Sequence, residues 1–411
     1  MIRPFAGLRP AAGRAAEVIA PPYDVLSTNE ARAQADGKPW SFLHISKPEI
    51  DLPPGTNPYA PEVYAKAADN LGVMLREGVL ARDPARCYYV YRLIMGAHTQ
   101  TGLVAAASLA EYGSNRIRKH EFTQPDKEND RVRQIEALNA QTGPVLLAYP
   151  DAPEIDDILA HCSAGVTDAD ATADSGIRHT LWVVRDADVQ AKLTLAFNAL
   201  PALYIADGHH RSAAASRVAA ARRDGNPRHT GEENYNYFLT VTFPYRQTQI
   251  LAYNRVVKDL NGMDAGAFLM RLRENFSVEK SPAPMNPASL AEFGLYVTGQ
   301  WYRLTLRREL IPVGNPVARL DVSLLSDHLL GPVLDITDSR GDKRIEYVGG
   351  IRGLPELEKR VNSGEMAAAF ALYPTRMEDL MSVAEAGKVM PTKSTWFEPK
   401  LADGLVSHVL D

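Results

Sequence analysis

The side chains best suited to chemistry stand in one short run of the sequence, which consists of Asp207, Gly208, His209, His210 and Arg211. The apolar residues 203–206 before this run predict a buried strand, and the Ala-rich residues 212–223 after it predict a helix. Asp-Gly is typical of a tight turn, because Asp bonds to nearby backbone and Gly tolerates a positive φ. An acid, two imidazoles and a guanidinium are therefore expected where a strand turns into a helix.

Phosphate chemistry would use all of these groups, because the free N–H groups and the dipole of a helix N-terminus favour an anion. We interpret Asp207 and His209 as catalytic, and Gly208, His210, Arg211 and Ser212 as phosphate contacts. Each residue taken singly also has a structural explanation, since His209 could cap the helix and Arg211 could lie on a solvated face. The sequence contains no Walker-type phosphate loop.

A second concentration of charge lies between residues 116 and 133. From Asp126 onward the pattern predicts a helix with a solvated, charged face, which needs no further explanation. Arg118, His120 and Glu121 precede this helix and are less easily explained in that way. A carboxylate among several cations stays ionised and can accept a proton or anchor a cation. Glu121 is therefore a candidate catalytic residue, with Arg118 and His120 as candidate phosphate or nucleotide contacts.

Two further segments carry candidate binding residues. Two prolines present Tyr23 and Asp24 on a rigid path, which is either a stiff connector or the wall of a substrate pocket that Arg131 would share. Near the C-terminal end, a cation and two hydroxyls stand together as Lys393, Ser394 and Thr395. They form either a polar loop docked on the core or a second loop that holds phosphate oxygens.

Composition limits the class of protein. The chain has 411 residues, 45% of them hydrophobic and 23% charged, as expected for a soluble globular protein. A net charge of −5 argues against a nucleic-acid partner, and the two cysteines argue against a disulfide framework or a cysteine-rich metal site. No signal peptide or apolar run of membrane-spanning length is present. We therefore expect a cytoplasmic protein that binds no membrane.

The alternation of strand and helix patterns predicts an α/β fold, in the mixed α+β sense. We expect three regions, which comprise residues 1–110, 111–230 and 231–411, with the Asp207 turn in the middle one. Within the first region, the alternating residues 42–46 predict a strand.

The chain resembles, over essentially its whole length, the family known as domain of unknown function 1015. The matching pieces are residues 21–25, His120-Glu121 with Asp130-Arg131, residues 206–211 and residues 391–397. Glu121 together with the 207–211 run also resembles the nucleotide pocket of the ParB/sulfiredoxin-like fold, and within it the free serine kinases. The resemblance implies a ParB/sulfiredoxin-like core with additional α/β elements at both ends.

In those kinases a Glu and the Asp of the turn are the acid and base residues, which implies these roles for Glu121 and Asp207. The resemblance implies a phosphotransferase that phosphorylates the hydroxyl of a free amino acid such as L-serine, with Mg²⁺ and with ATP or ADP as donor. The partners would be a small-molecule substrate and a nucleotide, in a possible homodimer. The alternatives are a metal-dependent phosphohydrolase, which lacks a clear set of metal ligands in the sequence, and a non-enzymatic ParB-like nucleotide-binding regulator.

Overall fold

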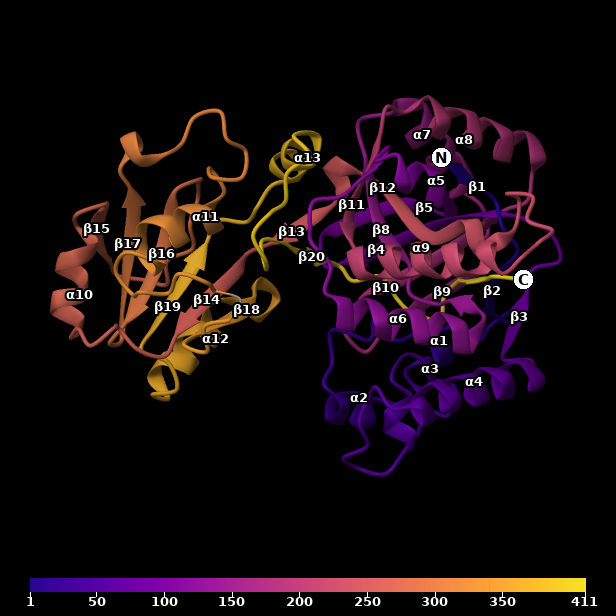
Figure 1. Cartoon of the computed structure of the whole chain (residues 1–411), viewed down its shortest axis with the longest axis horizontal. Helices are drawn as coiled ribbons and strands as arrows, with labels where there is room; N and C mark the ends of the chain where they lie inside the picture. Colours follow the sequence, from indigo (N-terminus) through magenta and orange to yellow (C-terminus); the bar gives the residue numbers. More distant parts are fainter. Residues whose placement is uncertain (340) are drawn as a thin grey trace. The chain divides into compact units, whose positions relative to one another are not determined.

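The computed structural model describes residues 1–339 and 341–411, and these form two compact units (Figure 1). The first unit comprises Met1–Thr248 and Pro399–Asp411, and the second comprises Gln249–Glu398. The three regions expected from the sequence do not coincide with these units. Residues 1–110 and 111–230 share one sheet, and the last residues of the chain belong to the same unit as the first.

A nine-stranded mixed sheet forms the centre of the first unit and confirms the mixed α/β class. Its order is β6-β11-β8-β12-β5-β4-β10-β9, with β1 paired to β5. The strands are β1 (Ile2–Arg3), β4 (Tyr88–Met95), β5 (His98–Ser108), β6 (Ile117–Arg118), β8 (Val145–Tyr149), β9 (Ala169–Thr172), β10 (Arg178–Val184), β11 (Leu203–Asp207) and β12 (Tyr237–Pro244). Two of its pairings are parallel, β11 with β6 and β8 with β12.

A smaller sheet of the first unit joins both ends of the chain. Its order is β3-β2-β21-β7, and its strands are β2 (Gly7–Pro10), β3 (Leu80–Arg82), β7 (Ala140–Gln141) and β21 (Ser407–Val409). Because β21 pairs with β2 and β7, residues after Pro399 run beside the N-terminal segment. This pairing places the segment around Asp403 in the first unit.

Nine α-helices are described in the first unit. They are α1 (Ala15–Val18), α2 (Thr28–Ala35), α3 (Leu43–Ser46), α4 (Pro61–Arg76), α5 (Leu109–Gly113), α6 (Pro125–Leu138), α7 (Pro153–Cys162), α8 (Ala187–Ala199) and α9 (His209–Asp224). Leu159 of α7 and Phe197 of α8 join the core of the large sheet, and α9 packs against α6, which packs against α4 (Figure 1).

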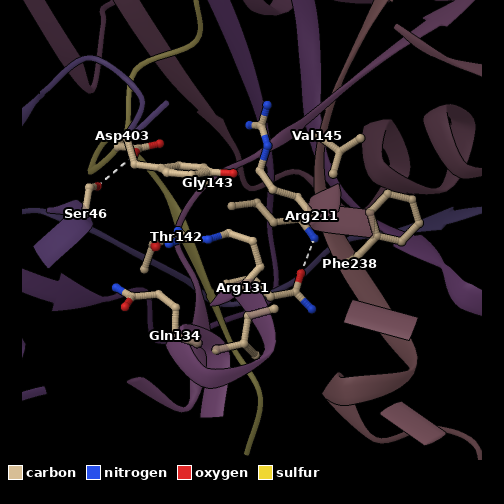
Figure 2. Close-up of a pocket in the computed structure, with 14 residues that line it drawn as sticks. Ser46, Arg131, Gln134, Thr142, Gly143, Val145, Arg211, Phe238 and Asp403 are labelled. Atoms are coloured by element: carbon tan, nitrogen blue, oxygen red, sulfur yellow. Dashed lines mark hydrogen bonds between the residues drawn. The ribbon is translucent and has the colours of Figure 1, made fainter. Parts of the chain in front are cut away.

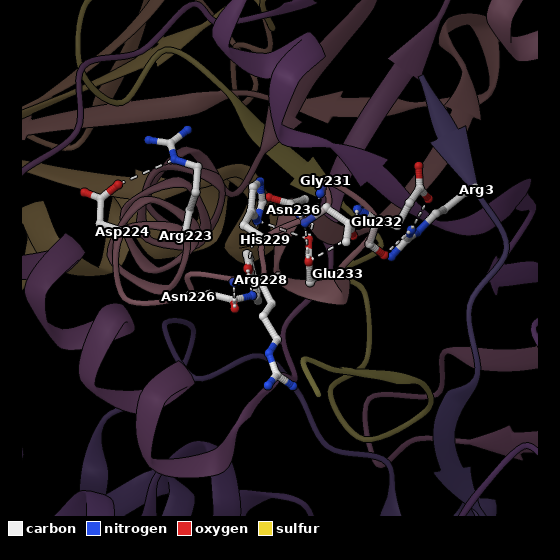
Figure 3. A network of polar contacts seen from close by, with 12 residues as sticks. Arg3, Arg223, Asp224, Asn226, Arg228, His229, Gly231, Glu232, Glu233 and Asn236 are labelled. Atoms are coloured by element: carbon white, nitrogen blue, oxygen red, sulfur yellow. Dashed lines mark hydrogen bonds and ion pairs between the residues drawn. The ribbon is translucent and has the colours of Figure 1, made fainter.

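The loop that follows α9 is held by one carboxylate (Figure 3). Glu233 accepts hydrogen bonds from the N–H groups of Thr230 (2.7 Å) and Gly231 (2.9 Å), and from the side-chain amide of Asn236 (3.0 Å). Desolvation would raise the pKa of Glu233, but these backbone donors lower it to about 2. These hydrogen bonds lie within the loop that connects the end of α9 to β12.

The second unit has its own six-stranded sheet, of order β15-β17-β16-β19-β14-β18, and a two-stranded one, β13-β20. Its strands are β13 (Gln249–Leu251), β14 (Tyr253–Val257), β15 (Phe276–Ser281), β16 (Glu292–Val297), β17 (Gln300–Leu306), β18 (Ile345–Gly349), β19 (Ala368–Leu372) and β20 (Trp396–Glu398). Its α-helices are α10 (Ala265–Leu272), α11 (Asp321–Leu325), α12 (Gly353–Asn362) and α13 (Met377–Glu385). Among residues 1–339 and 341–411, none of the helices has the length and apolar character needed to span a membrane.

One element prediction was wrong. The alternating residues 42–46 predicted a strand, whereas residues 43–46 form the short helix α3. Phe42, Leu43 and Ile45 are all buried against α4 and its neighbours. A short apolar segment that is buried in this way can be helical, and alternation over so few residues does not distinguish a helix from a strand.

Candidate functional site

Parallel pairing of two strands brings the predicted catalytic segments together. Ile117 of β6 pairs with Leu203 of β11, and Arg118 pairs with Tyr204. Because the carboxyl ends of parallel strands meet at one edge of a sheet, residues after both strands leave at the same place. Glu121 therefore arrives beside the turn that follows β11.

The turn itself has the geometry that its sequence predicted. Gly208 has φ +101° and ψ 28°, in the left-handed region that favours glycine, and α9 begins at the next residue. The pairing of β11 with β8 shifts its register between Ile205 and Asp207, which is a bulge just before the turn. The guanidinium of Arg211 lies over Gly208, where an added Cβ would meet Nε at 3.0 Å. The guanidinium of Arg211, in the first turn of α9, thus covers the turn at Gly208.

Glu121 faces His209 across this turn. Its Oε2 lies 3.6 Å from Nδ1 of His209, which is close but longer than a hydrogen bond. The His209 side chain is 3% exposed, whereas that of Glu121 is 40% exposed. The carboxylate can therefore reach a small molecule in solvent, while the imidazole beside it is fixed by packing.

A backbone hydrogen bond fixes the tautomer of His209. The N–H of His120 donates to Nε2 of His209 (3.3 Å), so the proton of the neutral ring is on Nδ1 and faces Glu121. Burial, together with the neighbouring His120, holds the pKa of His209 well below its usual value. His209 is therefore a neutral imidazole whose Nδ1–H faces the carboxyl group of Glu121.

His120, Glu121 and His209 also form a cluster whose possible ligand atoms lie within 4.8 Å of one another. Nδ1 of His120 is buried and has no hydrogen-bond partner among the described residues, so it could serve as a ligand atom. The lone pair of His209 at Nε2, in contrast, accepts the backbone N–H. A metal at Nδ1 of His209 would have to displace the proton that this arrangement requires there.

Asp207 lies between two cations. Its Oδ2 is 3.3 Å from Nη2 of Arg211 and 3.9 Å from Nζ of Lys400. Burial alone would raise the pKa of Asp207, but the charges of Lys400 and Arg211 lower it below the usual value. Lys400 was missed by the sequence interpretation, although it stands shortly after the predicted 393–395 loop and belongs to the first unit.

The other predicted phosphate contacts of the first unit, Arg118, His210 and Ser212, lie in different surroundings. The Arg118 guanidinium lies 5.6 Å from the ring of Tyr204, and Nε2 of His210 accepts the N–H of Gln124 (3.0 Å). Ser212 is fully buried, and its hydroxyl donates to the carbonyl of His209 inside α9. The structure thus brings His210 to the start of the helix and turns Ser212 towards the interior.

Next to the turn lies a cavity of about 330 Å³, to which Tyr23, Asp24, Arg131 and His210 all contribute. The Arg131 guanidinium lies 3.8 Å from the ring of Tyr23, so the predicted substrate residues contact each other. They come from segments more than 100 residues apart in the sequence.

A narrower recess of about 30 Å³ shares Tyr23, Ser46 and Arg131 with this cavity and ends at Arg211 and Asp403 (Figure 2). Ser46 donates to Oδ2 of Asp403 (2.6 Å), and burial raises the pKa of Asp403 to about 7 despite Arg211 and Arg131 nearby. Sequence interpretation gave no signal for Ser46 or Asp403, because a single Ser and a single Asp carry no spacing pattern.

Lys393, Ser394 and Thr395 belong to the second unit. Ser394 is buried and its hydroxyl donates to the carbonyl of Pro391 (2.6 Å), while Lys393 lies 5.3 Å from the ring of Tyr253. Their predicted contact with phosphate stays a prediction.

A family model described as "Protein of unknown function (DUF1015)" matches residues 2–323. The chain belongs to this family. The match includes Glu121, the Asp207 turn and the Tyr23–Asp24 segment, whereas Lys400 and Asp403 lie beyond the matched residues of this family member. No curated protein matches the chain.

Several solved structures are similar to this DUF1015 chain at low identity. Free serine kinase in complex with AMP is 14% identical over 72% of this chain and 86% of that one, with a TM-score of 0.35. A C-terminally truncated SbnI from Staphylococcus aureus is 10% identical over 73% and 85%, with a TM-score of 0.39. A conserved hypothetical protein from Pyrococcus furiosus is 15% identical over 74% and 93%, with a TM-score of 0.34. At such low TM-scores these likenesses establish neither a shared fold nor a shared activity.

Proposed function

We propose that the chain is a small-molecule phosphotransferase that phosphorylates the hydroxyl of a free amino acid, such as L-serine, from a nucleotide donor. The observation that carries this proposal is the position of Glu121, a partly exposed carboxyl group, beside the N-terminus of α9. A helix N-terminus binds phosphate, and a carboxylate next to it can take a proton from an attacking hydroxyl. The amino-acid acceptor rests on the resemblance of Glu121 and residues 207–211 to free serine kinases.

Each residue at the turn then has a role. The first N–H groups of α9 and the Arg211 guanidinium hold the phosphate oxygens, which positions the donor and spreads its charge. Glu121 accepts the proton as the acceptor oxygen forms its bond to phosphorus and the bond to the leaving phosphate breaks. His209 is a positioning residue, since its Nδ1–H faces the carboxylate. Asp207 orients Arg211 and Lys400 towards the phosphates.

Mg²⁺ fits the donor chemistry of the turn. This ion prefers oxygen ligands and is bound in phosphotransferases by one or two carboxylates together with substrate phosphates. Asp207 stays ionised and stands directly before the phosphate-binding turn, so it would hold the ion together with phosphate oxygens. When bound, the ion neutralises charge on the transferring phosphate.

A metal-dependent phosphohydrolase is the second candidate, and the cluster of His120, Glu121 and His209 is the observation that favours it. Two imidazoles and a carboxylate suit a transition metal better than Mg²⁺. The hydrogen bond to Nε2 of His209 opposes this use, because metal-binding imidazoles normally donate with their second nitrogen.

One assay separates these functions. Purified protein is incubated with ATP, ADP or pyrophosphate, with and without L-serine, and both phosphoserine and free phosphate are measured. Phosphoserine formation that needs Mg²⁺ is the expected result. Phosphate release without an acceptor, together with a bound transition metal, would favour the hydrolase. Nucleotide binding without formation of either product would favour a ParB-like regulatory protein that is not an enzyme.

A further inference from the structure

The cavity beside the turn carries a distribution of charge that the proposed function does not explain. Three acids, Asp24, Glu49 and Asp130, line it together with three cations, Lys47, Lys127 and Arg131. Its other lining side chains include the rings of Tyr23, Tyr59 and Tyr64 and the imidazole of His210. Burial and the Lys127 charge lower the pKa of His210, which keeps this imidazole neutral, so the charges of the lining balance.

Two of these acids and two of these cations already have partners. Nζ of Lys47 lies 3.1 Å from Oε1 of Glu49, and Arg131 pairs with Asp130 at 2.5 Å. Thr28 and Tyr64 complete the bonding of Glu49 and Asp130 with hydroxyl donors at 3.1 Å and 2.7 Å. These four charged groups are therefore satisfied before any ligand arrives.

Asp24 and Lys127 are different. Both are exposed in the cavity wall, and neither makes a hydrogen bond or an ion pair with the residues that the structure describes. The cavity thus offers one unpaired carboxylate and one unpaired ammonium to a ligand. Because both charges act on His210, both lie near the start of α9.

We propose that this cavity is the acceptor site and that it binds a zwitterion larger than serine, with its ammonium group at Asp24 and its carboxylate at Lys127. The inference rests on the proposed phosphotransferase function, but replaces its free amino acid acceptor with a larger zwitterion. An unpaired charge of each sign is complementary to a molecule that carries both. A nucleotide carries several negative charges and no compensating ammonium, so a lining of balanced charge suits it poorly. Its phosphates belong at the turn, where Arg211 and Lys400 supply cations.

The cavity has room for a ligand larger than serine. Its volume of about 330 Å³ is many times what one water molecule needs. Free serine would leave much of this space filled with water and the three tyrosine rings without a contact. A zwitterion with a longer body, of the size of a dipeptide, fills the cavity and covers these rings.

Direct binding in the absence of nucleotide tests the inference. Isothermal titration calorimetry is carried out with L-seryl-L-alanine, L-serine, and the N-acetylated and C-amidated forms of the dipeptide. The variants are Asp24→Asn and Lys127→Met, and the matched controls are Asp157→Asn and Lys192→Met, which change exposed residues of α7 and α8. All four substitutions are at exposed positions, so each variant is expected to keep the melting temperature of the parent protein.

We expect the dipeptide to bind the parent protein more tightly than serine does, and acetylation or amidation to weaken binding at least tenfold. Asp24→Asn should remove the effect of acetylation, and Lys127→Met the effect of amidation, while both controls bind as the parent does. Absence of dipeptide binding, or equal affinity in all variants, would overturn the inference. Phosphotransfer is measured separately. If the binding pattern holds but no phosphate is transferred, the cavity assignment stands and the proposed function fails.

Discussion

Oε2 of Glu121 lies 3.6 Å from Nδ1 of His209, although the two residues follow different strands of the large sheet, β6 and β11. Their proximity follows from the parallel pairing of β6 with β11, which ends both strands at one edge. The short β6, with only two residues, is enough to set this register. The relationship therefore depends on backbone pairing, and side-chain substitutions at the turn should change chemistry without changing the fold.

Removing either carboxylate should abolish most of the activity. We expect Glu121→Gln and Asp207→Asn each to reduce phosphotransfer by about 10²- to 10⁴-fold, because the first removes the proton acceptor and the second the charge that orients Arg211 and Lys400. Initial rates with L-serine and with seryl-alanine provide the measurement. Glu154→Gln and Asp157→Asn, which change exposed acids of α7, are the controls. Unchanged turnover in both site variants would contradict the assigned roles.

Gly208→Ala should damage both stability and phosphate binding. At φ +101° a Cβ is strained, at a cost of about 1–2 kcal/mol, and it would displace the Arg211 guanidinium, which lies 3.0 Å away. Urea unfolding and titration with ADP would measure the two effects.

Gly113→Ala is the matched control for this substitution, since Gly113 has no positive φ and a Cβ added there would meet nothing within 4 Å. It should leave nucleotide affinity unchanged. Equal losses in the two variants would show that Gly208 has no special conformation.

The sequence predicted the turn because its signal is local. Asp-Gly between an apolar run and an Ala-rich run is interpretable without any distant contact, and the structure has β11, a left-handed Gly208 and α9 in these places. The position of Glu121 could be proposed only through a resemblance, because strand pairing between distant segments leaves no local pattern. The resemblance named the residue, and the pairing of β6 with β11 explains it.

Other features could not be predicted. Lys400 and Asp403 reach the first unit because β21 returns to pair with β2 and β7, and no residue pattern near position 400 indicates that return. In the helix at 43–46, Leu43 and Ile45 are both buried among apolar neighbours, so the alternating pattern did not indicate a strand. Long-range pairing and enclosure from several sides are properties of the whole fold.

His209 should be a neutral imidazole with its proton on Nδ1 throughout the neutral range. Burial holds its pKa well below 6.5, and the N–H of His120 occupies Nε2. Long-range ¹H–¹⁵N NMR spectra of the imidazole rings should therefore show the Nδ1–H tautomer without titration between about pH 8 and 6. The ring of exposed His161 gives the internal comparison. A proton on Nε2 would remove the positioning role of His209 and restore the metal-binding alternative.

Burial of His120 should make the stability of the protein fall at acidic pH. An unfolded histidine takes up a proton near pH 6.5, whereas burial lowers the pKa of folded His120 to about 4. The contribution of neutral His120 is therefore complete above pH 6.5 and is lost as the pH falls towards 4. Stability measured by urea unfolding between these limits should decline more steeply in the parent protein than in His120→Gln. If the stability of the parent protein and of His120→Gln changed equally with pH, His120 would not be neutral in the folded chain.

Buried Asp403 should affect stability over nearly the same pH range as His120, but with the opposite sign, and Asp403→Asn tests this. Asp403 is 2% exposed, and burial raises its pKa to about 7 from the ordinary value of 3.8, although Ser46, Arg211 and Arg131 favour the ionised form. Between these two pH values the folded chain holds a proton that the unfolded chain releases, so stability falls as the pH rises through this window and levels off above it.

The amide of Asp403→Asn is neutral at every pH and keeps a partner for the Ser46 hydroxyl. The variant should therefore be more stable than the parent protein at pH 8, by up to a few kcal/mol, and should lose that advantage towards pH 4. Urea unfolding at intervals across this range measures the difference, with Asp157→Asn as an exposed control that should follow the parent curve. A variant whose stability runs parallel to the parent protein at all pH values would show that the Asp403 carboxyl is already ionised beside Arg211, and that the recess carries a permanent ion pair.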